Sequence, residues 1–205
     1  MPDPQTDIKR DAAHLARTDP LLARAAEIAG DFPVRLRLPG YATLIWLILG
    51  QQVSIAAAKA MFERLTAALG GEVKPESLLL LDDDTMRACG FTRMKAGYAR
   101  GIASETIDGS FDFDAITGMT DVDAIESLTS LRGIGAWTAE NYLMWALGRR
   151  DIFPGGDLAL RIGWQRLVGD DEPPSEAELR ETALGWAPRR TAASFLIWYF
   201  YLGTR

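Results

Sequence analysis

The stretch covering residues 121–147 limits the possible folds of this 205-residue chain more than any other. In its first half, apolar side chains recur at three-residue steps along one helix face, at Val122, Ile125, Leu128 and Leu131. In its second half, Trp137, Asn141, Met144 and Trp145 follow steps of three and four, which is again a helical spacing. Between the halves lie Gly133 and Gly135, where the backbone must bend sharply or approach a ligand closely. The pattern predicts two helices joined by a tight turn.

The second helix of this pair begins directly after the glycine turn. The first amides of a helix have no partners inside it, and they lie at the positive end of the helix dipole. Such a helix start suits a phosphate group. The sequence therefore indicates a helix pair that binds phosphate through its turn.

Residues 131–139, with the sequence LRGIGAWTA, resemble the hairpin of the helix-hairpin-helix DNA glycosylases. Further along, the loop FPGGD ends in Asp157 and resembles the segment that carries the catalytic aspartate of these enzymes. The resemblance extends to residues 48–54 and 186–190 and covers most of the chain from about residue 41. Within the family, the sequence is most similar to the 3-methyladenine DNA glycosylase II (AlkA-like) type, which removes alkylated purines.

Helical patterns recur along the rest of the chain, and no run of alternating apolar and polar residues suggests a strand, so we expect an all-α fold. One of these patterns predicts a closing helix over residues 188–202. The resemblance implies a single catalytic unit of two helical lobes with a reactive cleft between them. One lobe would span about residues 41–150, including the hairpin at 120–148, and the other would combine residues 1–40 with 151–205. The β-rich domain that precedes the best-known member has no counterpart in this length.

The net charge of −6 is unusual for a nucleic-acid-binding protein, because phosphate contacts commonly come from basic side chains. Basic residues do gather near the hairpin and in one other turn, and main-chain amides bind phosphate without formal charge. We therefore expect DNA binding of modest affinity and strong salt dependence.

The cysteine content restricts the chemistry further. Cys89 is the only cysteine, which excludes an intrachain disulfide, a cysteine metal site and the four-cysteine iron–sulfur cluster of some relatives. We expect no metal on side chains and no required cofactor. The polar N-terminal sequence lacks a signal-peptide pattern, and the longest apolar run, residues 41–49, is shorter than the ~20 residues that span a bilayer. These features predict a cytoplasmic protein without membrane contact, and we expect a monomer.

Asp157 is the candidate catalytic residue. By the resemblance, its carboxylate would stabilise positive charge on the sugar and orient or deprotonate the attacking water. The alternative is that Asp157 only caps the following helix, a contribution of ~1 kcal/mol. The hairpin upstream favours catalysis, and one residue can do both.

Trp137 occupies the hairpin position at which bifunctional relatives carry a lysine that forms a Schiff base. Because an indole has no such amine, we predict hydrolysis by water without strand cleavage. Purines alkylated at N3 or N7 are cationic, and indole faces attract cations by ~0.5–2 kcal/mol. The candidate substrate pocket comprises Trp137, Trp186, Asn141 and Tyr142, with core packing as the alternative for Trp186.

A glycosylase must rotate its target nucleotide out of the duplex. The candidate DNA contacts are Arg132, Gly133, Ile134, Gly135, Ala136, Thr138 and Arg161. By the resemblance, Gln51 and Gln52 form the wedge that fills the vacated position, although both could simply satisfy backbone groups between two helices. Related enzymes often hold a monovalent cation on hairpin carbonyls, so such an ion is a candidate structural ligand here.

These residues together indicate a monofunctional DNA glycosylase of base excision repair that releases 3-methyladenine and 7-methylguanine from damaged double-stranded DNA. Two alternatives stay open at this point. The same mechanism could act on uracil, hypoxanthine or an oxidised purine, which a panel of single-lesion duplexes would separate. A non-catalytic DNA-binding module would use the hairpin for phosphates only and release no base.

Overall fold

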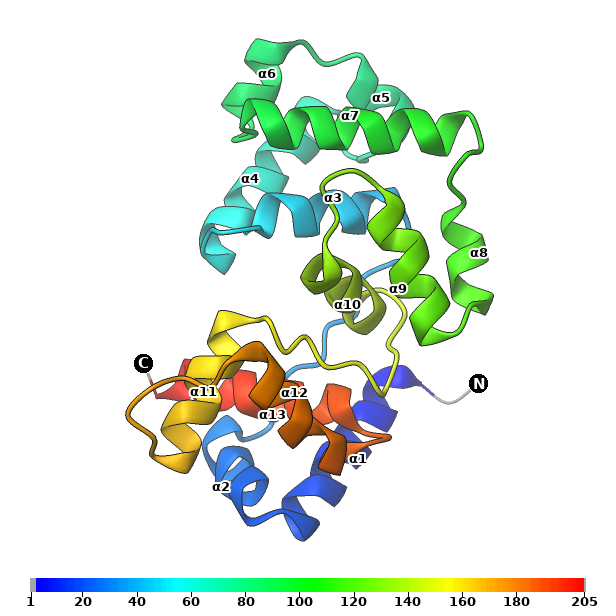
Figure 1. Ribbon diagram of the computed structural model, residues 1–205. Helices are drawn as coiled ribbons and strands as arrows, with labels where there is room; N and C mark the ends of the chain where they lie inside the picture. The colour runs from blue at the N-terminus through cyan, green and yellow to red at the C-terminus, as the bar shows by residue number, and fades with distance from the viewer. Residues whose placement is uncertain (1–2, 205) are drawn as a thin grey trace. The chain divides into compact units, whose positions relative to one another are not determined.

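The computed structural model describes residues 3–204, and within that range all regular secondary structure is helical (Figure 1). This confirms the predicted all-α fold class. Across the same residues, no helix combines the length and the hydrophobicity needed to span a membrane.

The chain forms two compact units. One unit comprises Met1–Leu36 and Leu143–Arg205, and the other comprises Arg37–Tyr142. We call them the terminal unit and the central unit. The boundaries expected after residues 40 and 150 lie a few residues later than these divisions. The second division falls within helix α10 (Ala136–Trp145), so this helix contributes residues to both units. The cleft expected between two lobes stays a prediction.

The terminal unit is assembled around its last helix, α13 (Arg190–Gly203), which packs against α1 (Pro4–Thr18), α2 (Pro20–Ala29), α11 (Leu158–Val168) and the 3₁₀ turn η1 (Leu184–Trp186). The side chains of residues 191–197 are all buried, so most faces of the first two turns of α13 lie in the core. Aromatic contacts extend this core, since the Phe195 ring lies 4.8 Å from that of Trp145. The unit also contains α12 (Glu176–Ala183).

The central unit is assembled around α3 (Tyr41–Gly50), an apolar helix with seven buried residues. It packs on α4 (Ile55–Ala68) and α7 (Arg93–Ile107), and the Tyr41 hydroxyl donates a hydrogen bond of 2.8 Å to the carbonyl of Ala99 in α7. Figure 1 shows the long α7 running alongside α5, a pair that the contacts also place together. The remaining helices of this unit are α5 (Pro75–Leu79), α6 (Asp83–Ala88), α8 (Phe113–Gly118) and α9 (Asp121–Ser130), followed by the first part of α10.

Capping side chains determine where most of these helices begin. Asp19, Asp157 and Ser175 each accept hydrogen bonds from the first amides of the helix that follows. Ser175 and Glu178 form a reciprocal capping box, as the spacing in the sequence indicates. The last helix begins at Arg190 and not at residue 188, because Arg189 has a φ of −126° and a ψ of 24°, outside the helical region.

The buried face of α9 differs from the predicted face. Val122 is 72% exposed, and the buried line runs through Ala124, Leu128 and Leu131. A strict three-residue step drifts around a helix of 3.6 residues per turn, so the first member of the predicted series falls on the solvent side.

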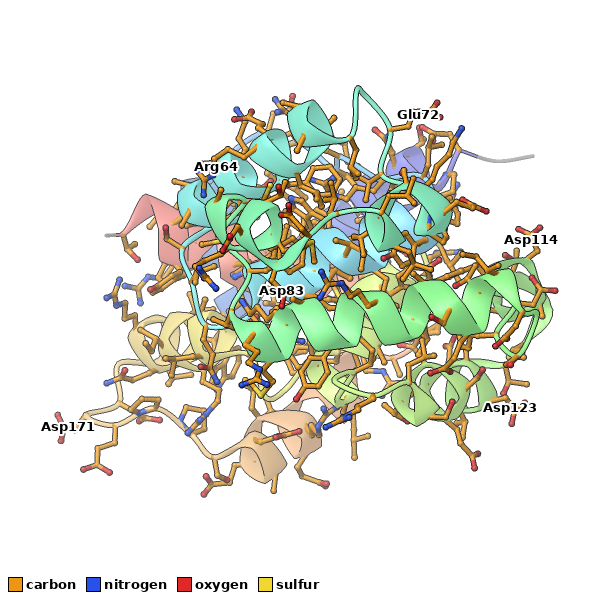
Figure 2. All side chains as sticks on the ribbon, turned by 90° about the horizontal axis from the view of Figure 1, so that it is seen from above. Arg64, Glu72, Asp83, Asp114, Asp123 and Asp171 are labelled. Carbon is orange, nitrogen blue, oxygen red and sulfur yellow. The ribbon has the colours of Figure 1, made fainter. Side chains whose placement is uncertain are left out.

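Many acidic side chains of the central unit project into solvent. Figure 2 shows the carboxylates of Glu72, Asp114 and Asp123 pointing away from the ribbon, and all three residues are exposed. The negative net charge is therefore carried largely by solvated surface groups, which leaves room for local basic sites elsewhere on this unit.

Helices α11 and α13 approach each other closely at Gly163. A Cβ atom at this position would lie 2.9 Å from both the carbonyl oxygen and Cγ2 of Ile197. We expect Gly163→Ala to lower the free energy of unfolding by about 1–3 kcal/mol, because the two helices would have to separate. Gly101→Ala in α7 is the control, since its Cβ would meet nothing within 4 Å; it should raise stability by about 0.5–1 kcal/mol. Urea unfolding measures both, and an unchanged stability of Gly163→Ala would contradict this packing.

Candidate active site

The hairpin turn lies between α9 and α10 in the central unit. The amide of Ile134 donates to the carbonyl of Leu131 at 3.1 Å, and Gly133 has a φ of 92°, in the left-handed region that favours glycine. A Cβ on Gly133 would lie 2.2 Å from the ring of Tyr98, so this ring packs directly against the turn. Gly135, in contrast, is exposed, and a Cβ at its position would meet nothing within 4 Å, which leaves its backbone accessible to a ligand.

The predicted DNA contacts of the hairpin divide by exposure. Arg132, Gly135 and Ala136 are exposed, and Gly133 is half-buried. Ile134 and Thr138 are buried as whole residues, at 5% and 2% exposed, so they support the turn from inside and do not form its surface. The surface of the turn is therefore formed by one arginine and by backbone atoms, as phosphate binding at a helix start requires.

Gln51 ties the α3–α4 turn to the hairpin. Its side-chain amide nitrogen donates to the carbonyl of Gly133 at 3.2 Å and to the hydroxyl of Thr138 at 3.1 Å. From the other side, the ammonium group of Lys95 donates to the carbonyls of Leu49 and Gln51, at 3.0 and 2.9 Å. Burial lowers the pKa of Lys95. These bonds join the end of α3, the start of α7 and the hairpin. Gln51 thus satisfies a backbone group, which is the alternative given above for this residue, whereas the role of Lys95 was not predicted from the sequence.

Gln52 lies at the apex of the same turn and has different surroundings. It is exposed and has a φ of 59°, the one positive φ of a non-glycine residue between residues 3 and 204. The flanking apolar side chains Val53 and Ile55 are 38% and 57% exposed. Of the two wedge candidates, Gln52 therefore has the exposure that insertion into a duplex requires, whereas the Gln51 side chain is hydrogen-bonded to the hairpin.

This difference predicts unequal effects of alanine substitution. Gln51→Ala should lower the free energy of unfolding by about 1–3 kcal/mol, because it removes two hydrogen bonds and leaves the buried Thr138 hydroxyl without its donor. Gln52→Ala should change stability by less than about 0.5 kcal/mol, since its side chain is exposed. Equal destabilisation in urea unfolding would contradict the assignment.

Asp157 lies in the terminal unit, at the start of α11, and is only 7% exposed. Its Oδ1 atom accepts hydrogen bonds from the amides of Ala159 and Leu160, at 2.8 and 3.2 Å, and its own amide donates to the carbonyl of Pro154. The cap that the sequence offered as the alternative is present, and it holds the carboxylate in one position.

The loop that leads to Asp157 is fixed to the N-terminal end of α13. The Thr191 hydroxyl is buried; it donates to the carbonyl of Arg149 at 2.6 Å and accepts from the amide of Ile152 at 3.0 Å. Beside it, the Asp151 carboxylate forms a two-pronged ion pair with Arg190, at 2.8 and 2.9 Å. These contacts restrict the backbone a few residues before Asp157.

Helix α12 supports the same loop from another direction. Arg180 donates to the carbonyl of Phe153 at 2.9 Å and forms an ion pair with Glu176. A Cβ on Gly155 would lie 2.6 Å from Cγ of Arg180, so the side chain packs directly over this glycine. The glycines before Asp157 are therefore needed for close packing against α12, and Arg180 is a supporting residue that the sequence did not reveal.

Trp186 is placed in the core of the terminal unit. It is 4% exposed, its ring contacts those of Phe153 and Trp164, and its indole nitrogen donates to Asp19 at 2.9 Å. This is the core-packing alternative given above for Trp186. Through Phe153 the tryptophan also supports the Asp157 loop.

The other pocket candidates lie on α10. Tyr142 is fully buried and its hydroxyl accepts a hydrogen bond of 2.7 Å from the amide of Gly40, while burial raises its pKa to about 12. Asn141 is 2% exposed and donates to the carbonyl of Trp137 at 2.8 Å. Trp137 itself is half-buried, which makes it the most accessible of the three.

Arg161, a predicted DNA contact, donates to the carbonyl of Pro174 at 2.6 Å and so holds the acidic turn after α11.

Residues 45–189 match the family described as HhH-GPD superfamily base excision DNA repair protein. The chain belongs to this superfamily. It is 31% identical over 199 residues to DNA-3-methyladenine glycosylase 1 of Schizosaccharomyces pombe, across 94% of this chain and 87% of that protein. It is 30% identical over 192 residues to the putative DNA-3-methyladenine glycosylase YfjP of Bacillus subtilis, and there the match spans 90% of this chain and 66% of the relative.

A solved structure of a similar protein supports the same family for this HhH-GPD protein. The S. pombe 3-methyladenine DNA glycosylase in complex with abasic DNA superposes with a TM-score of 0.86 at 30% identity, over 92% of this chain and 95% of that one. These similarities confirm the family that residues 131–139 and the Asp157 loop indicated.

Proposed function

We propose that this HhH-GPD protein is a monofunctional DNA glycosylase that hydrolyses the N-glycosidic bond of alkylated purines, 3-methyladenine and 7-methylguanine, in damaged duplex DNA. The observation that carries the proposal is the position of Asp157, a buried carboxylate held at a helix start on a loop that α12 and α13 both support. The names of the relatives from S. pombe and B. subtilis support the substrate class.

The carboxylate provides what cleavage of a glycosidic bond requires. As the base departs, positive charge develops on the sugar, and a fixed negative charge nearby lowers the energy of that state. Because the two amides of α11 already orient Oδ1, little reorganisation is needed when the charge appears. The same group orients or deprotonates the water that completes hydrolysis.

Trp137 determines two further features of the reaction. Its indole has no amine to attack the sugar, so water is the nucleophile and the DNA strand stays intact. Its aromatic face attracts the cationic ring of a purine alkylated at N3 or N7, which a neutral undamaged purine does not match. Trp137 is thus our candidate for recognising the charge of the damaged base.

Two turns of the central unit would contact the DNA, the hairpin and the turn between α3 and α4. The hairpin amides around Gly135 hold the strand, and Gln52 enters the position that the extruded nucleotide leaves. The carbonyls of Leu131 and Gly133 each accept a hydrogen bond and keep a second lone pair, so they fit a monovalent cation. Such an ion would help to shape the turn, and no step of the reaction depends on it. We expect the protein to act as a monomer.

The Asp157→Asn variant tests the catalytic role. Asparagine caps helices as well as aspartate does, so the fold should be retained, but the neutral amide cannot stabilise the charged sugar. We expect release of 3-methyladenine from methylated duplex DNA to fall at least about 100-fold while DNA binding is retained.

Asp82→Asn is the matched control, because Asp82 caps α6 through a bond of 2.7 Å to the amide of Thr85, in the central unit. It should excise at the parental rate. Parental excision by Asp157→Asn would remove the basis of the proposal.

Borohydride reduction tests the role of water as nucleophile. With Trp137 in place of the attacking lysine, no covalent protein–DNA adduct should form, and the DNA strand should break only after alkali treatment of the abasic product. A trapped adduct, or strand cleavage without alkali, would show that another amine attacks the sugar.

A further inference from the structure

A pocket of about 390 Å³ opens on the central unit next to the hairpin turn. Two of its lining residues, Arg93 and Arg132, come from the start of α7 and from the hairpin, and Met94, Gly97 and Tyr98 complete the lining. Since the Tyr98 ring packs directly against Gly133, the pocket is continuous with the turn that we propose holds DNA.

The two arginines of this pocket have no hydrogen-bonding or ionic partner in the part of the chain that the structure describes. Both are exposed, and neither donates a hydrogen bond or forms an ion pair with any residue between positions 3 and 204. No aspartate or glutamate is among the five lining residues, although the chain contains 28 acidic residues. Two guanidinium groups thus line one hollow without a compensating carboxylate.

An adjacent pocket shows how this surface neutralises arginines elsewhere. That pocket is lined by Arg87 and Arg100 as well as Arg93, and the first two form ion pairs with Asp84 and Asp83, at 2.9 and 2.5 Å. Arg93 has no such pair. The pocket shared by Arg93 and Arg132 therefore differs from its neighbour in having no carboxylate that pairs with its arginines.

We propose that Arg93 and Arg132 together bind one phosphodiester of the DNA strand, next to the phosphate held by the hairpin amides. A guanidinium group matches phosphate geometry and stays charged at any physiological pH. The apolar side chains of Met94, which is 63% exposed, and Tyr98 suit the sugar that adjoins the phosphate. This inference rests on the proposed function only in that it requires binding of duplex DNA.

The pocket also accounts for DNA binding by an acidic chain. A protein with net charge −6 gains little from its average field, so its affinity must come from a few unpaired cations close to the backbone amides of the turn. Arg93 and Arg132 are two such cations on elements that Gln51, Lys95 and Tyr98 hold together.

Salt dependence of duplex binding tests the proposal. The slope of log K against log salt for the native protein, measured by fluorescence anisotropy on an undamaged duplex, should become shallower by about 0.9 in the double variant Arg93→Ala/Arg132→Ala. Each single variant should bind about three- to tenfold more weakly at 0.1 M salt, and the double variant should bind less weakly than the product of the two effects, because both groups hold one phosphate.

Arg17→Ala is the control for charge alone. Arg17 is an exposed arginine of α1 in the terminal unit, and its substitution should leave the salt slope unchanged. An unchanged slope in the double variant, or an equal loss of slope in Arg17→Ala, would overturn the proposal.

A methyl resonance locates the contact. In protein labelled at methionine methyl groups, the Met94 signal should shift on addition of duplex DNA, while that of the buried Met144 should not. A shift with inorganic phosphate together with an unchanged salt slope would indicate a site for free anions and exclude the DNA assignment.

These measurements are independent of base release. If the native protein released no base but the salt slope fell as expected, the proposed function would be wrong and the phosphate site would stand. If excision occurred and the slope did not change, only the phosphate site would be wrong.

Discussion

A single buried hydroxyl group, that of Thr191, joins the loop before Asp157 to the first turn of the central helix of the terminal unit. The loop has no regular secondary structure, so its backbone groups must find partners one by one. Thr191 satisfies two of them, Arg180 satisfies a third, and the ion pair of Asp151 with Arg190 fixes the approach. The position of the reactive carboxylate thus depends on a helix that begins more than thirty residues later in the chain.

In the central unit, a side-chain amide and an amine supply the hydrogen bonds that loop backbone groups need. The α3–α4 turn and the hairpin have no common secondary structure, yet Gln51 and Lys95 connect both to the ends of buried helices. The segment that would enter the duplex and the segment that would hold the strand are therefore joined by side-chain hydrogen bonds. Rigid support of this kind reduces the conformational entropy that is lost when DNA is bound.

Local features of the structure were predictable from the sequence, and long-range contacts were not. Aspartate, serine and proline lie at the starts of helices such as α2, α11 and α12, and helix starts of this kind are predictable because capping depends only on neighbours in the chain. The cap at Asp157 was foreseen for the same reason. The roles of Trp186 and Tyr142 depend on partners at Asp19 and Gly40, far away in sequence, and no periodicity reports such contacts. The three-residue pattern at Val122 was misleading because a three-residue step drifts around a helix of 3.6 residues per turn, so its first member lies on the solvent side.

The acidic exterior has a consequence for how the protein would meet its substrate. Most of such a surface repels a polyanion, whereas Arg93, Arg132 and the helix-start amides of the hairpin would attract it. If the proposed phosphate site holds the strand, encounters in other orientations would be short-lived and little protein would stay on undamaged DNA. Weak general affinity would then permit rapid sampling of many positions along a genome, and charge would select the orientation of each productive encounter.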